Sequence, residues 1–141
     1  LLKNQVSNNV EIYYHDKLLR HHSIGQRASA LILFILMQSD NDIILIDQPE
    51  DDLDNKIIYD EVITAIAKKK QDIQFIFATH NANIPVLGDA ERIFVVEYQD
   101  TTIDISQGNI DLKSTHKQIV DIMEGGEEAF DKRQLIYTSW K

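Results

Sequence analysis

The stretch IILIDQPEDDLD, residues 43–54, joins four aliphatic side chains directly to a segment with five carboxylates in eight residues. A short, continuous aliphatic run is typical of a strand in the middle of a parallel sheet. Open parallel sheets bind ligands beyond the carboxyl ends of their strands, where loops and helix N-termini converge. The sequence therefore predicts a central strand at 43–46 and a functional edge immediately after it.

The segments around this strand predict an alternation of strands and helices. The stretch VEIYYH at 10–15 alternates and is rich in strand-forming residues, and a turn is expected at Asp16 and Lys17. Ser23 stands at the N-cap position of a mostly buried helix that contains RASALILFILMQS. The later patterns predict a helix from about Asn55 to Lys70, strands at 73–80, 91–98 and 101–106, a turn at 107–109, and helices at 114–124 and 126–138 broken at Gly125 and Gly126.

This order of elements predicts the α/β fold class, with a central, mostly parallel sheet flanked by helices and a helical C-terminal tail. The strand at 91–98 is a candidate for the same sheet. We expect a single domain over 1–141, with a motif-bearing core at 10–98 and a strand and helical tail at 101–141. The chain starts at Leu1 without a methionine and enters a strand pattern almost at once, so we expect a fragment of a longer protein.

Composition narrows the classes of protein to consider. The 141 residues are 43% hydrophobic, which suits one globular domain with a real core. The longest apolar run, LILFILM at 31–37, is far shorter than a membrane span, so no membrane partner is expected. The net charge of −9 argues against a broad nucleic-acid-binding surface, so DNA would have to be held by other regions. Without cysteine there are no disulfides, and a reducing cytoplasm is the expected location.

Polar residues follow two of the predicted strands at their carboxyl ends. Asp47 follows the aliphatic strand, and the segment 79–81, Thr-His-Asn, follows the next one. An aspartate in this place can hold a hydrated Mg²⁺, because magnesium prefers one or two carboxylates together with water and phosphate oxygens. The alternative is that the acids cap the next helix, which fits Asp51, Asp52 and Asp54. Taken alone, His80 is more often structural than catalytic, and 23–26 is an ordinary cap and turn.

The order of these motifs is more specific than any one of them. S-x-G-Q opens a helix, an aliphatic strand then ends in D-x-P-x-x-x-L-D, and a later strand ends in T-H. This order resembles the C-terminal lobe of an ABC-type ATPase head, a P-loop NTPase. Residues 22–26 resemble the signature motif usually written LSGGQ, 43–47 the Walker B strand, 52–54 the D-loop, and His80 the switch histidine. The matching stretch runs from about residue 10 to 98.

The amino-acid sequence of several segments is most similar to that of the chromosome-maintenance (SMC) and RecF/RecN-like branch of that superfamily. More narrowly, it resembles the large ATPases of bacterial DNA repair and phage defence. The segments are SIGQRASALILFILM, IDQPEDDLDN, FATHNANIPVLGDAERIFVVE and MEGGEEAF. The last of these, at 123–130, carries no chemistry that the sequence can assign, and its other interpretation is a Gly-Gly break between two helices.

The resemblance implies ATP and Mg²⁺ as cofactors, with Asp47 as the metal ligand. In such ATPases two heads enclose two ATP molecules, and the signature motif of one head contacts the nucleotide on the other, so a homodimer of heads is implied. A serine hydroxyl, a glycine that admits backbone N–H groups and a helix dipole suit a γ-phosphate. His80 would contact the γ-phosphate or the attacking water. The residues implied to contact ATP or couple the two sites are Ser23, Gly25, Gln26 and Asp54.

The sequence departs from the family pattern in two ways. No G-x-x-x-x-G-K-[ST] loop occurs in the chain, so an N-terminal Walker A lobe of the same protein must supply the phosphate-binding loop. Gln48 stands where most hydrolysing members have a glutamate, and a glutamine can orient water but is not a base. Glu50 takes that role if its loop turns it inward; otherwise it is a surface acid.

Three functions fit these features. The first is an ATP-driven dimerisation switch in DNA repair or antiviral defence. The second is a nucleotide-sensing clamp that binds ATP and dimerises but barely hydrolyses it, because of Gln48. The third is the ATPase subunit of a transporter.

Overall fold

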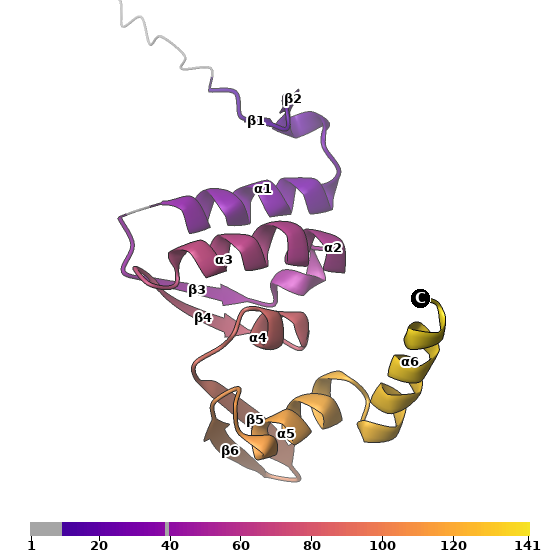
Figure 1. Ribbon diagram of the computed structural model, residues 1–141. Coiled ribbons are helices and arrows are strands. Elements are labelled where there is room, and N and C mark those ends of the chain that lie inside the picture. The colour runs from indigo at the N-terminus through magenta and orange to yellow at the C-terminus, as the bar shows by residue number, and fades with distance from the viewer. Residues whose placement is uncertain (1–9, 39) are drawn as a thin grey trace, which may run out of the picture.

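The computed structural model describes residues 10–38 and 40–141. Its central element is a pair of parallel strands, β3 (Ile43–Asp47) and β4 (Gln74–Ala78), in which Ile44 lies opposite Phe75 (Figure 1). The predicted parallel pairing is confirmed, although the sheet in the described chain has only these two strands. Both strands run the same way, so their carboxyl ends meet at one edge.

Two long helical elements cover one face of this pair. The first is α1 (Ile24–Met37), and the second runs from α2 (Asn55–Ile57) through the π-helical segment η3 (Ile58–Ile63) to α3 (Thr64–Lys69). Aliphatic side chains from the strands and helices fill the space between them, and full burial of each contributes about 1.5–3 kcal/mol. The buried core comprises Leu36, Ile44, Leu53, Ile58, Val62, Ile63, Ile66, Ile73 and Ile84.

The opposite face of the pair is uncovered. Ile43, Leu45 and Ile76 point to that side and are 58%, 68% and 43% exposed. A central strand of a parallel sheet, as predicted for the aliphatic run, is usually covered on both faces, but none of the described helices packs on this side. Alternate residues of a strand point to opposite faces, so only half of the run enters the core.

The N-terminal strand is shorter than predicted. β1 (Tyr13–Tyr14) and β2 (Lys17–Leu18) form a small antiparallel hairpin, followed by the 3₁₀ helix η1 (Leu19–His21). His15 and Asp16 have φ values of 46° and 58°, so the turn comes one residue earlier than the sequence indicated.

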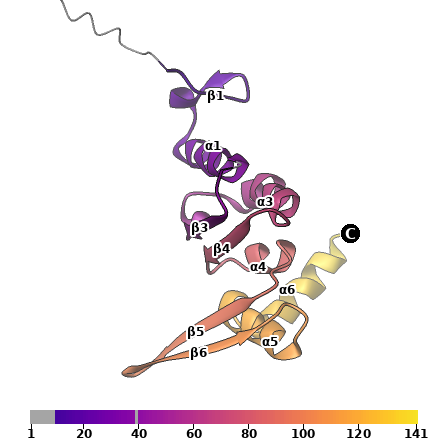
Figure 2. The ribbon, with the colours of Figure 1, turned by 90° about the vertical axis from the view of Figure 1, so that its left-hand side faces the viewer.

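The part of the chain after β4 differs from the prediction in two respects. β5 (Ile93–Gln99) pairs with β6 (Thr102–Gly108) in a separate antiparallel hairpin and does not join β3 and β4 (Figure 2). α4 (Asn83–Leu87), a short helix that the sequence did not predict, follows β4. The two predicted tail helices are confirmed as α5 (Lys113–Met123) and α6 (Glu127–Ser139). Within the described residues, no helix has the length and apolarity needed to cross a membrane.

Candidate functional site

The two loops that follow β3 and β4 lie side by side. Asp47 and Ala78 are opposite each other at the ends of the strands, and the Gln48 N–H donates to the Ala78 carbonyl at 2.8 Å. Gln48 has a left-handed backbone, with φ 45° and ψ 58°. This bend turns the chain into the 3₁₀ helix η2 (Pro49–Asp51), which carries Glu50 toward the loop after β4.

Glu50 is turned inward, and its side chain is only 5% exposed. Its Oε1 accepts hydrogen bonds from the Thr79 hydroxyl at 2.7 Å and the His80 N–H at 2.6 Å, and it lies 3.0 Å from His80 Nδ1. Its Oε2 is buried without a hydrogen-bond partner. A buried carboxylate oxygen is costly to leave unsatisfied, and Oε2 is closed to solvent, so it is a spare acceptor only for a group that enters by displacing the atoms around it.

The hydrogen bonds around Glu50 set its charge. Burial is the largest influence and raises its pKa, but the Thr79 hydroxyl, the N–H groups of Glu50 and His80, and the His80 ring together outweigh it and lower the pKa below the ordinary 4.5. Glu50 is therefore ionised at neutral pH. A lowered pKa also makes it a weak base, which suits accepting and orienting hydrogen bonds better than taking a proton.

The contact with Glu50 fixes the orientation of His80. A carboxylate only accepts hydrogen bonds, so a hydrogen bond between them requires the proton on Nδ1. The side chain of His80 is 64% exposed, which leaves Nε2 free to meet a ligand. The structure thus joins two predicted site residues, Glu50 and His80, through two contacts at Glu50 Oε1.

A pocket of about 520 Å³ opens beside this pair. Asn55 Oδ1 accepts from Asn81 Nδ2 at 2.7 Å and from Asn83 Nδ2 at 3.3 Å, which ties the start of α2 to the loop after β4. The sequence gives no signal for Asn55 and Asn83, because surface asparagines carry no motif. The pocket is lined by Glu50, Leu53, Asp54, Asn55, His80, Asn81, Ala82, Asn83, Met123 and Glu124.

Asp54 lines this pocket and also caps a helix. Its Oδ1 accepts from the Ile57 N–H at 2.9 Å, which satisfies one of the free donors at the start of α2. The capping alternative that the sequence left open is therefore observed for Asp54. Asp47 and Gln48 are exposed at the edge of the sheet and do not line the pocket.

Ser23 and Gln26 form a reciprocal capping box at the start of α1. The Gln26 N–H donates to Ser23 Oγ, and the Ser23 N–H donates to Gln26 Oε1, both at 3.2 Å. A Cβ on Gly25 would lie 3.0 Å from the Asp52 carbonyl oxygen, so a side chain here would require the neighbouring backbone to shift by a few tenths of an ångström. The predicted signature segment thus lies against the predicted D-loop, but it does not line the pocket around His80.

The residues at the sheet edge suit a magnesium ion that is bound by few protein ligands. Among the described residues, no group of three or more His, Asp or Glu side chains is arranged to hold a metal ion. Magnesium is commonly bound by one or two carboxylates with phosphate and water oxygens, and the exposed Asp47 carboxylate at the sheet edge can serve as such a ligand.

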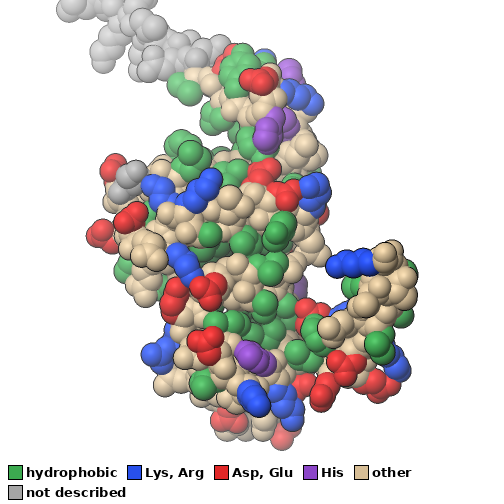
Figure 3. Space-filling model, viewed as in Figure 1, with side chains coloured by type: hydrophobic (Ala, Val, Ile, Leu, Met, Phe, Trp, Pro, Cys, Tyr) green, Lys and Arg blue, Asp and Glu red, His purple; other side chains and the backbone are tan. Residues whose placement is uncertain are grey.

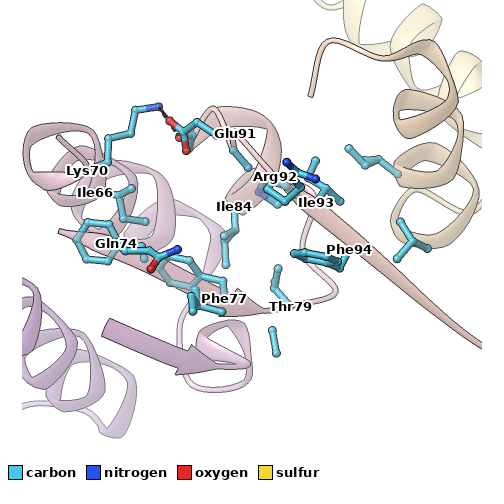
Figure 4. A pocket seen from close by; sticks show the side chains of 18 of the residues that line it. Ile66, Lys70, Gln74, Phe77, Thr79, Ile84, Glu91, Arg92, Ile93 and Phe94 are labelled. Carbon is cyan, nitrogen blue, oxygen red and sulfur yellow. Dashed lines mark hydrogen bonds and ion pairs between the residues drawn. The ribbon is translucent and has the colours of Figure 1, made fainter. Parts of the chain in front are cut away.

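A second, larger cavity of about 1150 Å³ lies between β4 and β5 (Figure 4). Consecutive residues of both strands line it, 73–79 on one side and 93–96 on the other. Ile84 from α4 and Ile119 from α5 add apolar surface. Side chains alternate along a strand, so an unbroken run of lining residues means that the edges of β4 and β5 face the cavity.

Comparisons with known proteins agree with the fold. A solved structure described as "Structural biochemistry of ATP-driven dimerization and DNA stimulated activation of SMC ATPases" is similar with a TM-score of 0.59 and 21% identity, over 82% of this chain and 74% of that one. A comparison with curated proteins gives no match. A family model described as "AAA domain, putative AbiEii toxin, Type IV TA system" matches residues 10–86, more than half of the chain. The chain therefore belongs to this AAA domain family of P-loop ATPases.

Proposed function

We propose that this chain is the lobe of an ABC-type ATPase head that carries the signature motif, Walker B strand, D-loop and switch histidine, and that ATP binding drives dimerisation of two such heads. The observation that carries the proposal is the Glu50, Thr79 and His80 cluster at the carboxyl edge of a parallel strand pair, with a buried carboxylate oxygen left free. Such an edge is where parallel sheets bind their ligands.

Each residue has a role in this proposal. Mg²⁺, held by Asp47 and phosphate oxygens, would neutralise charge on the transferred phosphate. Glu50 would orient the ring of His80 through Oε1, and the exposed side chain of His80 would face the γ-phosphate. Ser23, Gly25 and Gln26 at the start of α1 would contact the nucleotide of the opposing head, and Asp54 would couple the two sites.

An N-terminal lobe that contains the phosphate-binding loop is the proposed partner within the same protein. The cavity between β4 and β5 supports this, because the free edges of two strands face it and its lining is rich in apolar side chains. A strand added there would satisfy unpaired backbone groups on both sides. Helices of the same lobe would cover Ile43, Leu45 and Ile76 on the open face of the strand pair.

The proposed setting is DNA repair or antiviral defence, with DNA bound by other parts of the complete protein. The amino-acid sequence of the motifs and the fold similarity to an SMC ATPase support this setting. The net charge of −9 supports a DNA contact outside this lobe.

A slow, clamp-like ATPase is the second candidate, and one observation favours it. Gln48 occupies the position of the usual base, and the lowered pKa of Glu50 makes it a poor replacement. An enzyme without an efficient base would hold ATP for longer and remain dimeric.

The test is ATP binding, dimerisation and turnover of the complete protein, wild type against Gln48→Glu. We expect the wild type to bind Mg²⁺ and ATP, to dimerise on binding, and to turn over slowly. The substitution should raise turnover about tenfold or more, since it supplies a general base. Fast wild-type turnover that the substitution does not change would reject the clamp and leave a working ATPase. Absence of ATP binding would reject the ATPase function itself.

A further inference from the structure

A segment to which none of the motifs assigns a role also lines the pocket around His80. Met123 and Glu124, at the C-terminal end of α5, line the pocket around His80 together with the loops after β3 and β4. They belong to the MEGGEEAF stretch at 123–130, for which the sequence supports only a break between two helices.

The shape of this corner depends on two glycines. Gly125 and Gly126 have φ values of 80° and 92°, which residues with a side chain rarely adopt. The Gly126 N–H donates to the Val120 carbonyl at 3.0 Å, which closes the end of α5 before α6 begins. We call residues Met123–Gly126 the α5–α6 corner.

α5 itself is fixed firmly to the hairpin of β5 and β6. Thr115 is 2% exposed, and a Cβ on Gly108 would lie 2.2 Å from its Oγ1, so the helix sits directly on the end of β6. Gln118 Nε2 donates to Ser106 Oγ at 2.6 Å, and Ile119 is buried. The corner is therefore attached to a well-anchored helix on one side.

On its other side the corner is held by α6. Arg133 Nη2 donates to the Glu124 carbonyl at 2.8 Å and to the Glu124 carboxylate, so one guanidinium fixes both backbone and side chain. Among the described residues, Arg133 is the α6 side chain that makes hydrogen bonds outside its own helix. α6 otherwise stands out from the body (Figure 3).

We propose that the α5–α6 corner is the third wall of the nucleotide site and that Arg133 is a positioning residue that fixes the conformation of Glu124 within this wall. The other two walls are tied together by the Asn55, Asn81 and Asn83 hydrogen bonds, whereas the corner makes no described side-chain bond to either. Its place beside His80 comes from the anchored α5, and the Arg133 clasp fixes the conformation of Glu124 within it. This inference rests on the proposed ATPase function and assigns the MEGGEEAF stretch to the same site.

The two methionines of the chain, Met37 and Met123, allow a test that does not require turnover. Met37 lies at the end of α1 and is 70% exposed, whereas Met123 lines the pocket. In the complete protein labelled with ¹³C-methyl methionine, Mg²⁺ and a slowly hydrolysed ATP analogue should shift the Met123 signal and leave Met37 in place. A Met123→Leu variant assigns the signal, and analogue binding is measured separately by calorimetry.

The same titration with Arg133→Gln should leave analogue affinity within about twofold but broaden the Met123 signal or reduce its shift, and Arg133→Lys should restore part of it. Lys132→Gln is the matched control, because Lys132 pairs only with the exposed Glu128 on the same helix. In turnover assays we expect Arg133→Gln to lower kcat about tenfold with little change in KM for ATP, since misplaced site groups act mainly on the chemical step.

The outcomes separate the two proposals. If the analogue binds and Met123 does not respond, or if Arg133→Gln behaves like Lys132→Gln in both assays, the third wall is rejected while the ATPase function stands. If the analogue does not bind at all, the ATPase function and this inference fail together.

Discussion

Glu50 illustrates how a single backbone bend determines the chemistry of this site. The left-handed conformation of Gln48 directs the chain so that Glu50, two residues later, enters the protein and meets Thr79 and His80. Aspartate and asparagine adopt this left-handed conformation more readily than glutamine, so the sequence does not predict the bend at Gln48. The alternative of a surface acid was open from the sequence, and the bend decides against it.

The lowered pKa of Glu50 predicts a pH dependence of stability. The pKa is lower in the folded than in the unfolded protein, so the unfolded protein binds more protons as the pH falls below about 4.5. The stabilisation is thus complete at neutral pH and is lost as the pH falls through the folded-state pKa. We expect Glu50→Gln to cost about 1–3 kcal/mol at pH 7 and much less near pH 3, measured by urea unfolding of the complete protein.

Glu128→Gln provides the control for this experiment, because the Glu128 side chain is 83% exposed. It should change stability by less than about 0.5 kcal/mol at either pH. A penalty for Glu50→Gln that stays constant from pH 7 to pH 3 would mean that the charge of Glu50 contributes nothing.

Among the secondary-structure elements, the π-helical segment η3 departs most from a regular pattern. π-Helical turns inside α-helices are frequent at functional sites. Here η3 carries Glu61, whose carboxylate accepts from the Tyr14 hydroxyl and, at 2.8 Å, from Ser29 Oγ. Three elements therefore meet at one carboxylate: the β1–β2 hairpin, α1 and η3.

Removing the Tyr14 hydroxyl should reveal how much this junction contributes. Burial, followed by the hydrogen bond to Glu61, raises the pKa of Tyr14, so the phenol remains protonated and donates. We expect Tyr14→Phe to destabilise the protein by about 1–2 kcal/mol in chemical unfolding. Tyr13→Phe is the matched control, since Tyr13 is 61% exposed and the hydrogen bond described for its hydroxyl goes to the nearby Glu11 at 3.4 Å. Equal effects of the two substitutions would show that the Glu61 junction adds no stability.

Elements were predictable wherever a local signal dominates. The N-cap at Ser23, the existence of the strands β3 and β4 and the break at Gly125 and Gly126 all follow from neighbouring residues. The separation of β5 from β3 and β4 does not, because strand pairing depends on chain segments far apart in sequence. Glu50 and His80 were identified at the sheet edge, but Asn55, Asn83 and the α5–α6 corner join them only through tertiary packing.

One feature of the molecule as a whole is the apolar face of β3 and β4 that no described helix covers. If the proposed N-terminal lobe covers that face, Ile76→Asp in the complete protein would bury an unpaired charge. We expect it to lower the free energy of unfolding by about 3 kcal/mol. Thermal or chemical unfolding of the complete protein measures this cost.

Leu135→Asp on α6 is the matched control, because Leu135 is 72% exposed and outside both cavities. We expect it to change stability by less than about 0.5 kcal/mol. An equally small effect of Ile76→Asp would indicate that Ile76 faces water in the complete protein too, and the proposed covering lobe would have to lie elsewhere.

The free edges of β4 and β5 also affect how the protein assembles during synthesis. Unpaired strand edges beside apolar side chains accept any extended segment that reaches them, including a strand from another copy. During synthesis a strand of the proposed N-terminal lobe would compete with every such segment for as long as the cavity stays open. A cell that makes this protein therefore benefits from having the cavity filled before the concentration of half-assembled chains rises, and slow assembly should appear as aggregation rather than as lost activity.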